Sequence, residues 1–580
     1  MTVLQALNKY YVRMAERREV VAPGYSMEPI GFVITLGLDG SIANVSDRRD
    51  TIAKRGRPEN VPKWFGRAGQ GSTPYLFWDN TGYALGVTAK PGEKVLKDHD
   101  AFKALHIKNL QNETDEGLIA LRRFIETWKT ENFSEPFFKK DFLDLNVAFC
   151  LEEERQLIHE RPVAAKLIEE CRQPKESEPI FCLVTGVSAP GVRLHPKIKG
   201  VRGASVAEVP LVSFNENAFW SYGKEQGHNA PTSEQAAFQY GAALNRLLDR
   251  NSGNHLLISD TTVIYWADAE GFGEEAAAAA EQLMALGFEP PGDGAEAQKI
   301  RDVLKLIHDG RPLREIDPKL EPRTRFYILG LAPNAARLSV RYWMNDEFGN
   351  FARRLAAHYE DLNIEPAPWR ERLPSIYRLL IKTTAVLEKP ENVPPLLAGE
   401  MTRAVLEGLP YPRTLLTAAI MRLRAGDPPH TGWHAAIIKA CINRNVPAKE
   451  KLPVARDTDS PDQAYQLGRL LAVLEAAQYA ALGHVNASIV DRYYGAASAT
   501  PARVFGTLLR NARNHVSDAI KRGKGRWVEA RLNEIFGHLP PEFPKTLSLE
   551  EQGRFAVGYY HERAWRGPGE AAPQAEEDAQ

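Results

Sequence analysis

The hydrophobic pattern changes its period part-way along this 580-residue chain, and that change restricts the folds that it can adopt. Residues 30–36 (IGFVITL) are a short apolar run that ends at residues 37–40 (GLDG), which is typical of a strand followed by a hairpin turn. Near the other end, apolar residues recur every three or four positions, at Leu467, Leu470, Leu471, Leu474, Ala477 and Ala481. We therefore predict an α+β protein with a β-rich beginning and a helical end.

Local patterns assign most of the chain to elements. Helices are predicted at 1–20, within 98–173, at 232–249 with Thr232 or Ser233 as N-cap, and at 273–286. Strands are predicted at 30–36, 41–45, 180–187, 211–214, 262–266 and 326–331, and a hairpin at 75–87 around Asp79-Asn80-Thr81-Gly82. Beyond about residue 334 the sequence predicts helices for nearly the whole chain, with a break at 523–525.

These elements suggest five parts. They are a β-rich N-terminal unit (1–97), a mixed α/β body (98–350), a helical connector (351–460), an all-α C-terminal helical bundle (461–567) and an acidic tail (568–580). The tail is rich in Pro, Gly and Ala, so we expect it to be disordered. Residues 447–462 are polar and contain Pro, which makes this segment the best candidate for a linker.

Cysteine usage and hydropathy indicate the compartment. The four cysteines Cys150, Cys171, Cys182 and Cys441 form no Cys-x-x-Cys pair and match no zinc module, so we expect free, buried thiols in a reducing compartment. No apolar stretch approaches the roughly 20 residues that a bilayer-spanning helix needs. The N-terminus is charged and amphipathic, unlike a signal peptide. We expect a soluble, cytoplasmic protein with no membrane contact.

The common enzymatic motifs are absent from the sequence. It contains no Gly-x-x-x-x-Gly-Lys-Ser/Thr loop, no Gly-x-Gly-x-x-Gly after a strand, no His-Glu-x-x-His and no Gly-x-Ser-x-Gly. We expect no cofactor and no metal. A metal-dependent nuclease that uses Asp260, or the pair Asp141 and Asp144, remains an alternative, because such enzymes need carboxylates that converge on divalent ions. A turn-capping role is the competing interpretation of Asp260.

Basic residues gather in separate blocks, although the formal net charge is only −1. Residues 48–67 hold seven cations and two anions, and residues 503–531 hold eight cations and two anions. Within 63–74 (KWFGRAGQGSTP) the glycines allow a close approach of the backbone to a phosphate or a groove, and Gln70 and Ser72 can both donate and accept hydrogen bonds. This pattern suits a protein that touches a polyanion at chosen points, while solvated surface charge is the alternative for each block.

Several longer blocks carry a resemblance to a known family. They are 24–30 (GYSMEPI), 74–80 (PYLFWDN), 195–201 (HPKIKGV), 211–223 (LVSFNENAFWSYG), 229–233 (NAPTS), 240–248 (YGAALNRLL), 260–266 (DTTVIYW) and 327–341 (YILGLAPNAARLSVR). In order and spacing, over residues 1 to about 550, the chain resembles the Csd-type large subunit (Cas-eight-c family) of the type I-C CRISPR Cascade complex.

The resemblance implies a function. Such a subunit is not an enzyme; it sits beside a Cas-five-type subunit at the crRNA 5′ end of a filament of backbone subunits. It recognises the protospacer-adjacent motif in duplex DNA, helps to open the strands, and offers a platform to a separate helicase–nuclease. Its C-terminal region resembles the small subunit of the complex. A purely structural scaffold and the nuclease above are the competing hypotheses.

The resemblance also gives the basic residues their expected roles. We predict that the flanking motif is read by Arg67, Gly69, Gln70, Gly71 and Ser72. Contacts with the DNA backbone are predicted for Lys54, Arg55, Arg57, Lys63, Lys197, Lys199 and Arg202. Contacts with the displaced strand are predicted for Arg510, Arg513, Lys521, Arg522, Lys524 and Arg526.

Overall fold

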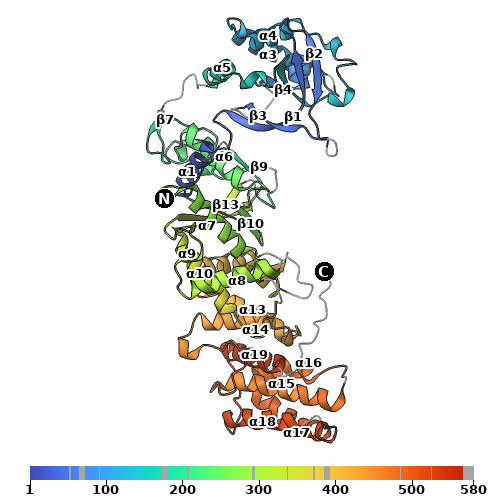
Figure 1. Cartoon of the computed structure of the whole chain (residues 1–580), viewed down its shortest axis with the longest axis vertical. Helices are drawn as coiled ribbons and strands as arrows, with labels where there is room; N and C mark the ends of the chain where they lie inside the picture. Colours follow the sequence, from blue (N-terminus) through green and yellow to red (C-terminus); the bar gives the residue numbers. More distant parts are fainter. Residues whose placement is uncertain are drawn as a thin grey trace. The chain divides into compact units, whose positions relative to one another are not determined.

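In the computed structural model the chain forms two compact units (Figure 1). The first unit holds Met1–Lys197 with Val212–Arg246, and the second holds Ile198–Leu211 with Leu247–Gln580. The structure describes residues 1–17, 19–50, 54–63, 72–90, 92–172, 179–204, 208–290, 294–335, 337–369, 373–384, 392–483, 485–523 and 526–565. Helices make up 51% of the structure and strands 16%, with a helical region at the C-terminal end, which confirms the predicted α+β class.

A five-stranded sheet is the centre of the first unit. Its strands are β1 (Tyr25–Leu36), β2 (Ile42–Asp47), β3 (Arg57–Pro62), β4 (Trp78–Asn80) and β5 (Asn146–Leu151). The order is β2-β1-β5-β4, and β3 pairs with the first half of β1. The predicted hairpin of the first apolar run is confirmed, because β1 and β2 pair antiparallel.

The period-two pattern of β1 explains how the sheet is buried. Phe32, Ile34 and Leu36 lie in a core that α3 (Glu93–Leu110) and α4 (Glu116–Thr127) share, whereas Val33 belongs to a second core, because alternate side chains of a strand point to opposite faces. Ile30 also belongs to the second core, because the pairing of β1 with β5 shifts between Ile30 and Phe32. The strand is therefore covered on both sides.

Two predictions for the first unit are wrong. The hairpin expected at 75–87 is absent: β4 pairs with β5 instead, and Thr81–Ala84 form the short helix α2. The Asn80 side chain accepts a hydrogen bond from the backbone N–H of Tyr83 at 3.2 Å, and this cap starts a helix where the sequence suggested a turn. The helical prediction for 98–173 also missed β5, a buried run that pairs with β1 far away in sequence.

The remaining elements of the first unit are α1 (Val3–Glu16), α5 (Pro162–Arg172), β6 (Pro179–Phe181), β7 (Ser188–Pro190) and α6 (Glu234–Leu247). Helix α5 joins the core of the five-stranded sheet. Tyr11 meets Phe238 edge-on at 5.9 Å between ring centroids, which joins α1 to α6. Ser233 caps α6, as predicted, because its hydroxyl accepts from the N–H of Ala236 at 3.2 Å.

An antiparallel sheet begins the second unit. Its strands run in the order β10 (His255–Ile258), β11 (Thr261–Ala267), β12 (Arg325–Asn334) and β13 (Arg337–Glu347). A separate pair is formed by β8 (Lys197–Lys199) and β9 (Glu208–Pro210), so the strand predicted at 211–214 lies just past the true one. The helices α7 (Gly273–Phe288), α8 (Gly294–His308), α9 (Leu313–Ile316) and α10 (Phe348–Leu362) share the core of the sheet.

The sequence prediction missed β13, because nearly the whole chain beyond about residue 334 was expected to be helical and no strand was predicted there. The pairing of β12 with β13 shifts between Gly330 and Leu331, so Tyr342 and Val340 face consecutive residues of β12. The extra residue, Arg341, forms a bulge that breaks the alternation of buried and exposed side chains along β13. Because that alternation is the sequence signal of a strand, the strand was hard to recognise.

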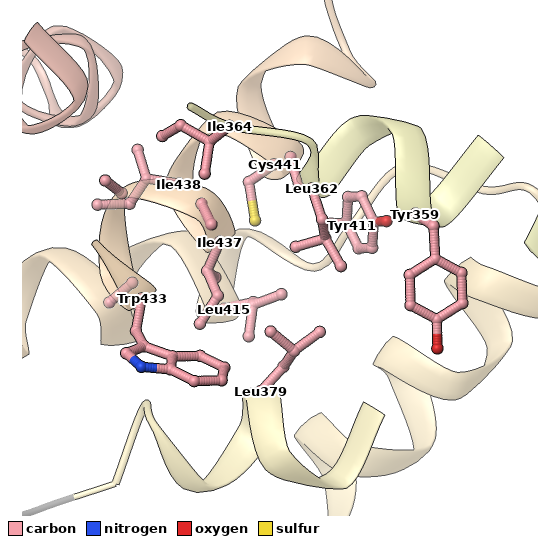
Figure 2. Packing of buried hydrophobic residues seen from close by; sticks show 14 of the residues in the cluster. Tyr359, Leu362, Ile364, Leu379, Tyr411, Leu415, Trp433, Ile437, Ile438 and Cys441 are labelled. Carbon is pink, nitrogen blue, oxygen red and sulfur yellow. The ribbon is translucent and has the colours of Figure 1, made fainter. Parts of the chain in front are cut away.

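Nine helices complete the part of the second unit that the structure describes. They are α11 (Ile376–Ile381), α12 (Pro395–Glu407), α13 (Arg413–Arg424), α14 (Trp433–Asn443), α15 (Gln463–Leu482), α16 (Ile489–Ala499), α17 (Pro501–Lys521), α18 (Arg526–His538) and α19 (Leu549–Ala564). Figure 2 shows part of their core, where side chains of α10, α11, α13 and α14 interdigitate. One continuous apolar cluster reaches from the β10–β13 sheet to α19. The five sequence-derived boundaries stay predictions.

The long helix predicted from the leucine pattern is α15, and it is the centre of the C-terminal bundle. It packs against α19, α17 and α18 (Figure 1). Where α15 meets α19, a Cβ added to Gly468 would collide with the Phe555 carbonyl, and one added to Gly558 would collide with the Tyr465 carbonyl. The two helices can approach this closely only because both positions are glycine.

Buried charges fix α18 and the segment 447–462 on α15. Arg469 of α15 is fully buried and pairs with Glu534 of α18 and Glu562 of α19. Arg456 lies in the segment expected to be a linker and pairs with Glu562 at 2.7 Å. The Asn443 side chain also bonds both backbone groups of Leu452. The segment is therefore packed into the bundle.

Candidate nucleic-acid interface

The loop predicted to read DNA falls largely outside the described residues. Arg67, Gly69, Gln70 and Gly71 belong to that undescribed part, and Ser72 is the first described residue after it, with a partly buried side chain. Both flanks of the loop are firmly held. The Lys63 backbone N–H donates to the Gly24 carbonyl at 2.7 Å, and beyond the loop the ring of Tyr75 stacks on Trp78 at 4.8 Å.

The predicted DNA-backbone residues of the first unit differ in availability. Lys54 and Arg55 are exposed, and their side chains have no hydrogen-bond or ion-pair partner among residues 54–63 or the other described ranges. Arg57 is exposed and lies 3.5 Å from Glu59. Lys63 instead pairs with Glu28 at 2.7 Å and lies 5.6 Å from the centre of the Tyr75 ring.

The length of β3 sets the distance between Lys54 and Arg55, two predicted contacts with the DNA backbone, and the start of the predicted reading loop. Arg57 begins the strand and Pro62 ends it, immediately before Lys63. Six residues of extended chain span about 17 Å, which is about five base pairs along a duplex. The free cations Lys54 and Arg55 therefore lie about one strand length from the start of the predicted reading loop.

The next predicted cations lie on or after β8. Lys197 and Lys199 flank the buried Ile198 and are both exposed. Lys199 pairs with Glu208 of β9 at 3.1 Å, so part of its charge is compensated. Arg202 is exposed and has no partner within the described ranges.

The cations predicted to contact the displaced strand form an ordered surface on α17. Phe505, Leu508, Ala512 and Ala519 are buried in the bundle and fix the rotation of the helix. The opposite face carries exposed residues at helical spacing, which we name the α17 stripe: Arg503, Thr507, Arg510, Arg513, Asn514, Ser517 and Lys521. From Arg503 to Lys521 the helix rises by 18 residue steps, so the stripe is about 27 Å long.

The α17 stripe is electrostatically unbalanced. Arg503 and Arg513 have no partner in the described parts of the chain, and Arg510 only donates to the Thr507 hydroxyl at 3.3 Å. Lys521 pairs with Asp518 at 3.3 Å, and both of these side chains are exposed. The sequence prediction omitted Arg503 from the site, although its distance of seven residues from Arg510 places it on the same face.

The last predicted cations lie at the junction of α17 and α18. Arg522 follows the end of α17, and Arg526 begins α18. Both are exposed and have no partner among the residues that the structure describes. Lys524 lies outside the described residues.

Comparison with known proteins identifies the family. The family described as CRISPR-associated protein (Cas_Csd1) matches residues 7–566, which is nearly the whole chain. The chain belongs to the Csd1 family of CRISPR-associated proteins. The resemblance drawn from the sequence blocks is thereby confirmed, and the Csd1 chain is a subunit of a CRISPR Cascade complex. No curated protein matches it.

Each carboxylate of the nuclease alternative has an internal partner in this Csd1 chain. Asp260 accepts from Arg341 and from the Thr261 hydroxyl, each at 3.0 Å. Asp141 pairs with Arg49 at 2.8 Å, whereas Asp144 accepts from the Thr88 hydroxyl. Within the described ranges, no three His, Cys, Asp or Glu side chains are placed to hold one metal ion.

The cysteines of the Csd1 chain are free thiols. Cys150, Cys182 and Cys441 are buried free thiols, as predicted, and Cys171 is only partly buried. Burial raises the pKa of the Cys150 thiol. Over the described residues, no helix combines the length and the apolar character that crossing a bilayer requires.

Proposed function

We propose that this protein is the target-recognising large subunit of a type I-C Cascade surveillance complex. The observation that carries the proposal is the family match, which runs from the first helix to the end of the last. In this proposal the subunit lies at the crRNA 5′ end beside a Cas-five-type subunit, and it contacts backbone and small subunits. It is not an enzyme, and it works in the cytoplasm.

In this proposal the crRNA and the protein recognise different parts of the target. Because crRNA reads the target by base pairing, the protein needs only a reader of the short flanking motif and contacts with the DNA backbone. We assign motif reading to Arg67, Gly69, Gln70, Gly71 and Ser72. We assign backbone contacts to Lys54, Arg55, Arg57, Lys63, Lys197, Lys199 and Arg202. The free side chains of Lys54 and Arg55 support this assignment best, whereas the Glu28 ion pair makes Lys63 the weakest member.

Strand opening needs a surface for the displaced strand. The α17 stripe supports this role, since a row of exposed, mostly unpaired cations along a rigid helix can track a phosphate backbone. Arg522, Lys524 and Arg526 extend the assignment toward α18. The opened complex then recruits the helicase–nuclease.

A reconstituted complex tests the proposal. The complex is assembled on crRNA with and without this subunit, and strand opening is followed by permanganate reactivity of target thymines. The proposal predicts opening next to a correct flanking motif only when the subunit is present. Equal opening without it would contradict the proposal.

A second assay separates recognition from catalysis. The purified chain is incubated with labelled duplex and Mg²⁺ or Mn²⁺, and we expect cleavage only after the helicase–nuclease has been added to the assembled complex. Cleavage by the chain alone, lost on Asp260→Asn or on Asp141→Asn with Asp144→Asn, would favour the nuclease alternative.

A further inference from the structure

A cavity of about 200 Å³ opens where α15, α16 and α17 meet. Its floor is apolar: Leu474 of α15 and Leu508 and Ala512 of α17 are all buried. Its rim is polar and comes from all three helices. Ligand sites commonly combine an apolar floor with a few converging polar groups, and this cavity has both.

Four polar side chains of the rim are available to a ligand. Arg492 and Tyr493 reach the rim from α16, and Asn511 and His515 reach it from α17. None of these four side chains makes a hydrogen bond or an ion pair within the described ranges of the chain. The side-chain oxygen of Gln478 on α15 accepts a hydrogen bond from the Ile489 N–H at 3.0 Å, which fixes the start of α16 against α15. This contact ties two of the helices that form the cavity to each other.

The cavity adjoins the α17 stripe. Asn511 follows Arg510 directly in the helix, and His515 follows Asn514. Because successive residues are about 100° apart around a helix, the stripe and the cavity rim lie on neighbouring faces of α17. A nucleic-acid strand whose phosphates follow the stripe therefore has its bases within reach of the cavity.

We propose that this cavity binds one unstacked base of a single-stranded nucleic acid whose phosphates lie on the α17 stripe. The inference rests on the proposed function and adds a base site to it. The Tyr493 ring offers a stacking surface, the apolar floor receives the other face of the base, and the Asn511 amide can donate to and accept from the base edge. A duplex keeps its bases paired, so the site is selective for single strands.

Oligonucleotides without bases test the proposal directly. Fluorescence anisotropy compares the full chain binding a labelled oligonucleotide of about 12 thymidines with binding an abasic strand of the same length and charge. Stacking of a base on an aromatic ring is worth about 1–3 kcal/mol, so we expect the thymidine strand to bind about 5- to 150-fold more tightly. Tyr493→Ala and Asn511→Ala should reduce this preference, and Tyr493→Phe should keep it.

Two variants provide matched controls. Arg503→Gln removes a stripe cation and should weaken both strands by the same factor, because it contacts only phosphate. Asn533→Ala alters an exposed asparagine of α18, away from the cavity, and should change neither affinity. Photocrosslinking of a 5-iodouracil strand to unmodified protein gives a readout that needs no variant, and the crosslink is expected on Tyr493.

The outcomes distinguish this inference from the function on which it rests. If both strands bind alike and Arg503→Gln weakens both, the phosphate-tracking stripe stands and the base site is refuted. If neither strand binds, the stripe assignment fails as well. A base preference that survives Tyr493→Ala also refutes the site. If the site is supported, a ribonucleotide strand identifies the source: tighter DNA binding assigns it to the displaced strand, and tighter RNA binding assigns it to the guide.

Discussion

Neutralising the α17 stripe should weaken target binding and make it less sensitive to salt. The perturbation is the joint replacement of Arg503, Arg510, Arg513 and Lys521 by Gln, all four of which are exposed. Glutamine has a helix propensity close to that of arginine and lysine, and it removes the charge. The buried face of α17 is unchanged, so the bundle should keep its thermal stability.

The magnitude follows from counterion release. Each phosphate contact on a single strand contributes about −0.7 to the slope of log K against log salt, so four contacts contribute about −2.8. Between 1 M and 0.15 M salt this slope corresponds to about 200-fold in affinity, or about 3 kcal/mol. The exposed Asp518 beside Lys521 partly compensates that cation, so the measured change in slope should lie between about 2 and 3.

The assay is the affinity of the assembled complex for its target over a series of salt concentrations. The control variant replaces Lys90, Lys94, Lys97 and Lys108, four exposed lysines on or just before α3, so its net charge changes equally. The stripe variant should lose affinity and slope, and the control should lose neither. An unchanged slope in the stripe variant, or an equal loss in the control, would refute the reasoning.

Three further predictions concern stability. Gly468→Ala forces a Cβ into the Phe555 carbonyl and should lower the free energy of unfolding by at least about 1–3 kcal/mol. The control Gly506→Ala, whose Cβ meets no atom within 4 Å, should leave the free energy of unfolding equal or higher. Urea denaturation compares the two variants, and equal free energies would contradict the close-approach argument. Arg469→Met leaves the buried Glu562 with fewer partners and should lower the free energy of unfolding by about 3 kcal/mol. The control Arg513→Met changes an exposed residue and should lower it by less than about 0.5 kcal/mol. An unchanged free energy of unfolding in Arg469→Met would show that the buried cluster is not stabilising. Desolvation lowers the pKa of His106 to about 4 and that of His358 to about 3 in the folded protein, so below pH 6.5 the unfolded state binds protons that the folded state does not. The contribution of the two neutral histidines to the free energy of unfolding is complete above pH 6.5 and is lost as the pH falls, by about 2 kcal/mol for each histidine at pH 5. Denaturation curves that coincide at pH 7.5 and pH 5 would contradict this prediction.

Local patterns predicted the elements whose signals are continuous in sequence. The apolar run that ends at Leu36 is a strand, and the leucine repeat of α15 is one long helix, because each pattern matches the period of its element. Elements whose pairing is distant were missed. The burial of β5 depends on its pairing with β1, more than a hundred residues earlier. The bulge in β13 interrupts the alternation of buried and exposed side chains that would indicate a strand.

The candidate site was predictable only where charge and helical period coincide. Arg510 and Arg513 share an exposed face of α17, as their spacing of three indicates, and the same rule could have found Arg503. The Glu28 ion pair of Lys63 could not be foreseen, because the two residues are 35 positions apart and meet only through β1–β3 pairing. The cavity between α15, α16 and α17 has no sequence signal, since its rim comes from three helices.

The most direct measurement is the affinity of the reconstituted complex for a library of targets with randomised flanking bases. It compares the parent complex with one that carries Arg67→Ala, Gln70→Ala and Ser72→Ala together. If these residues inspect the flank, the parent prefers a narrow set of motifs, and the variant binds the library with a much flatter distribution. The same motif preference in both complexes would contradict the account.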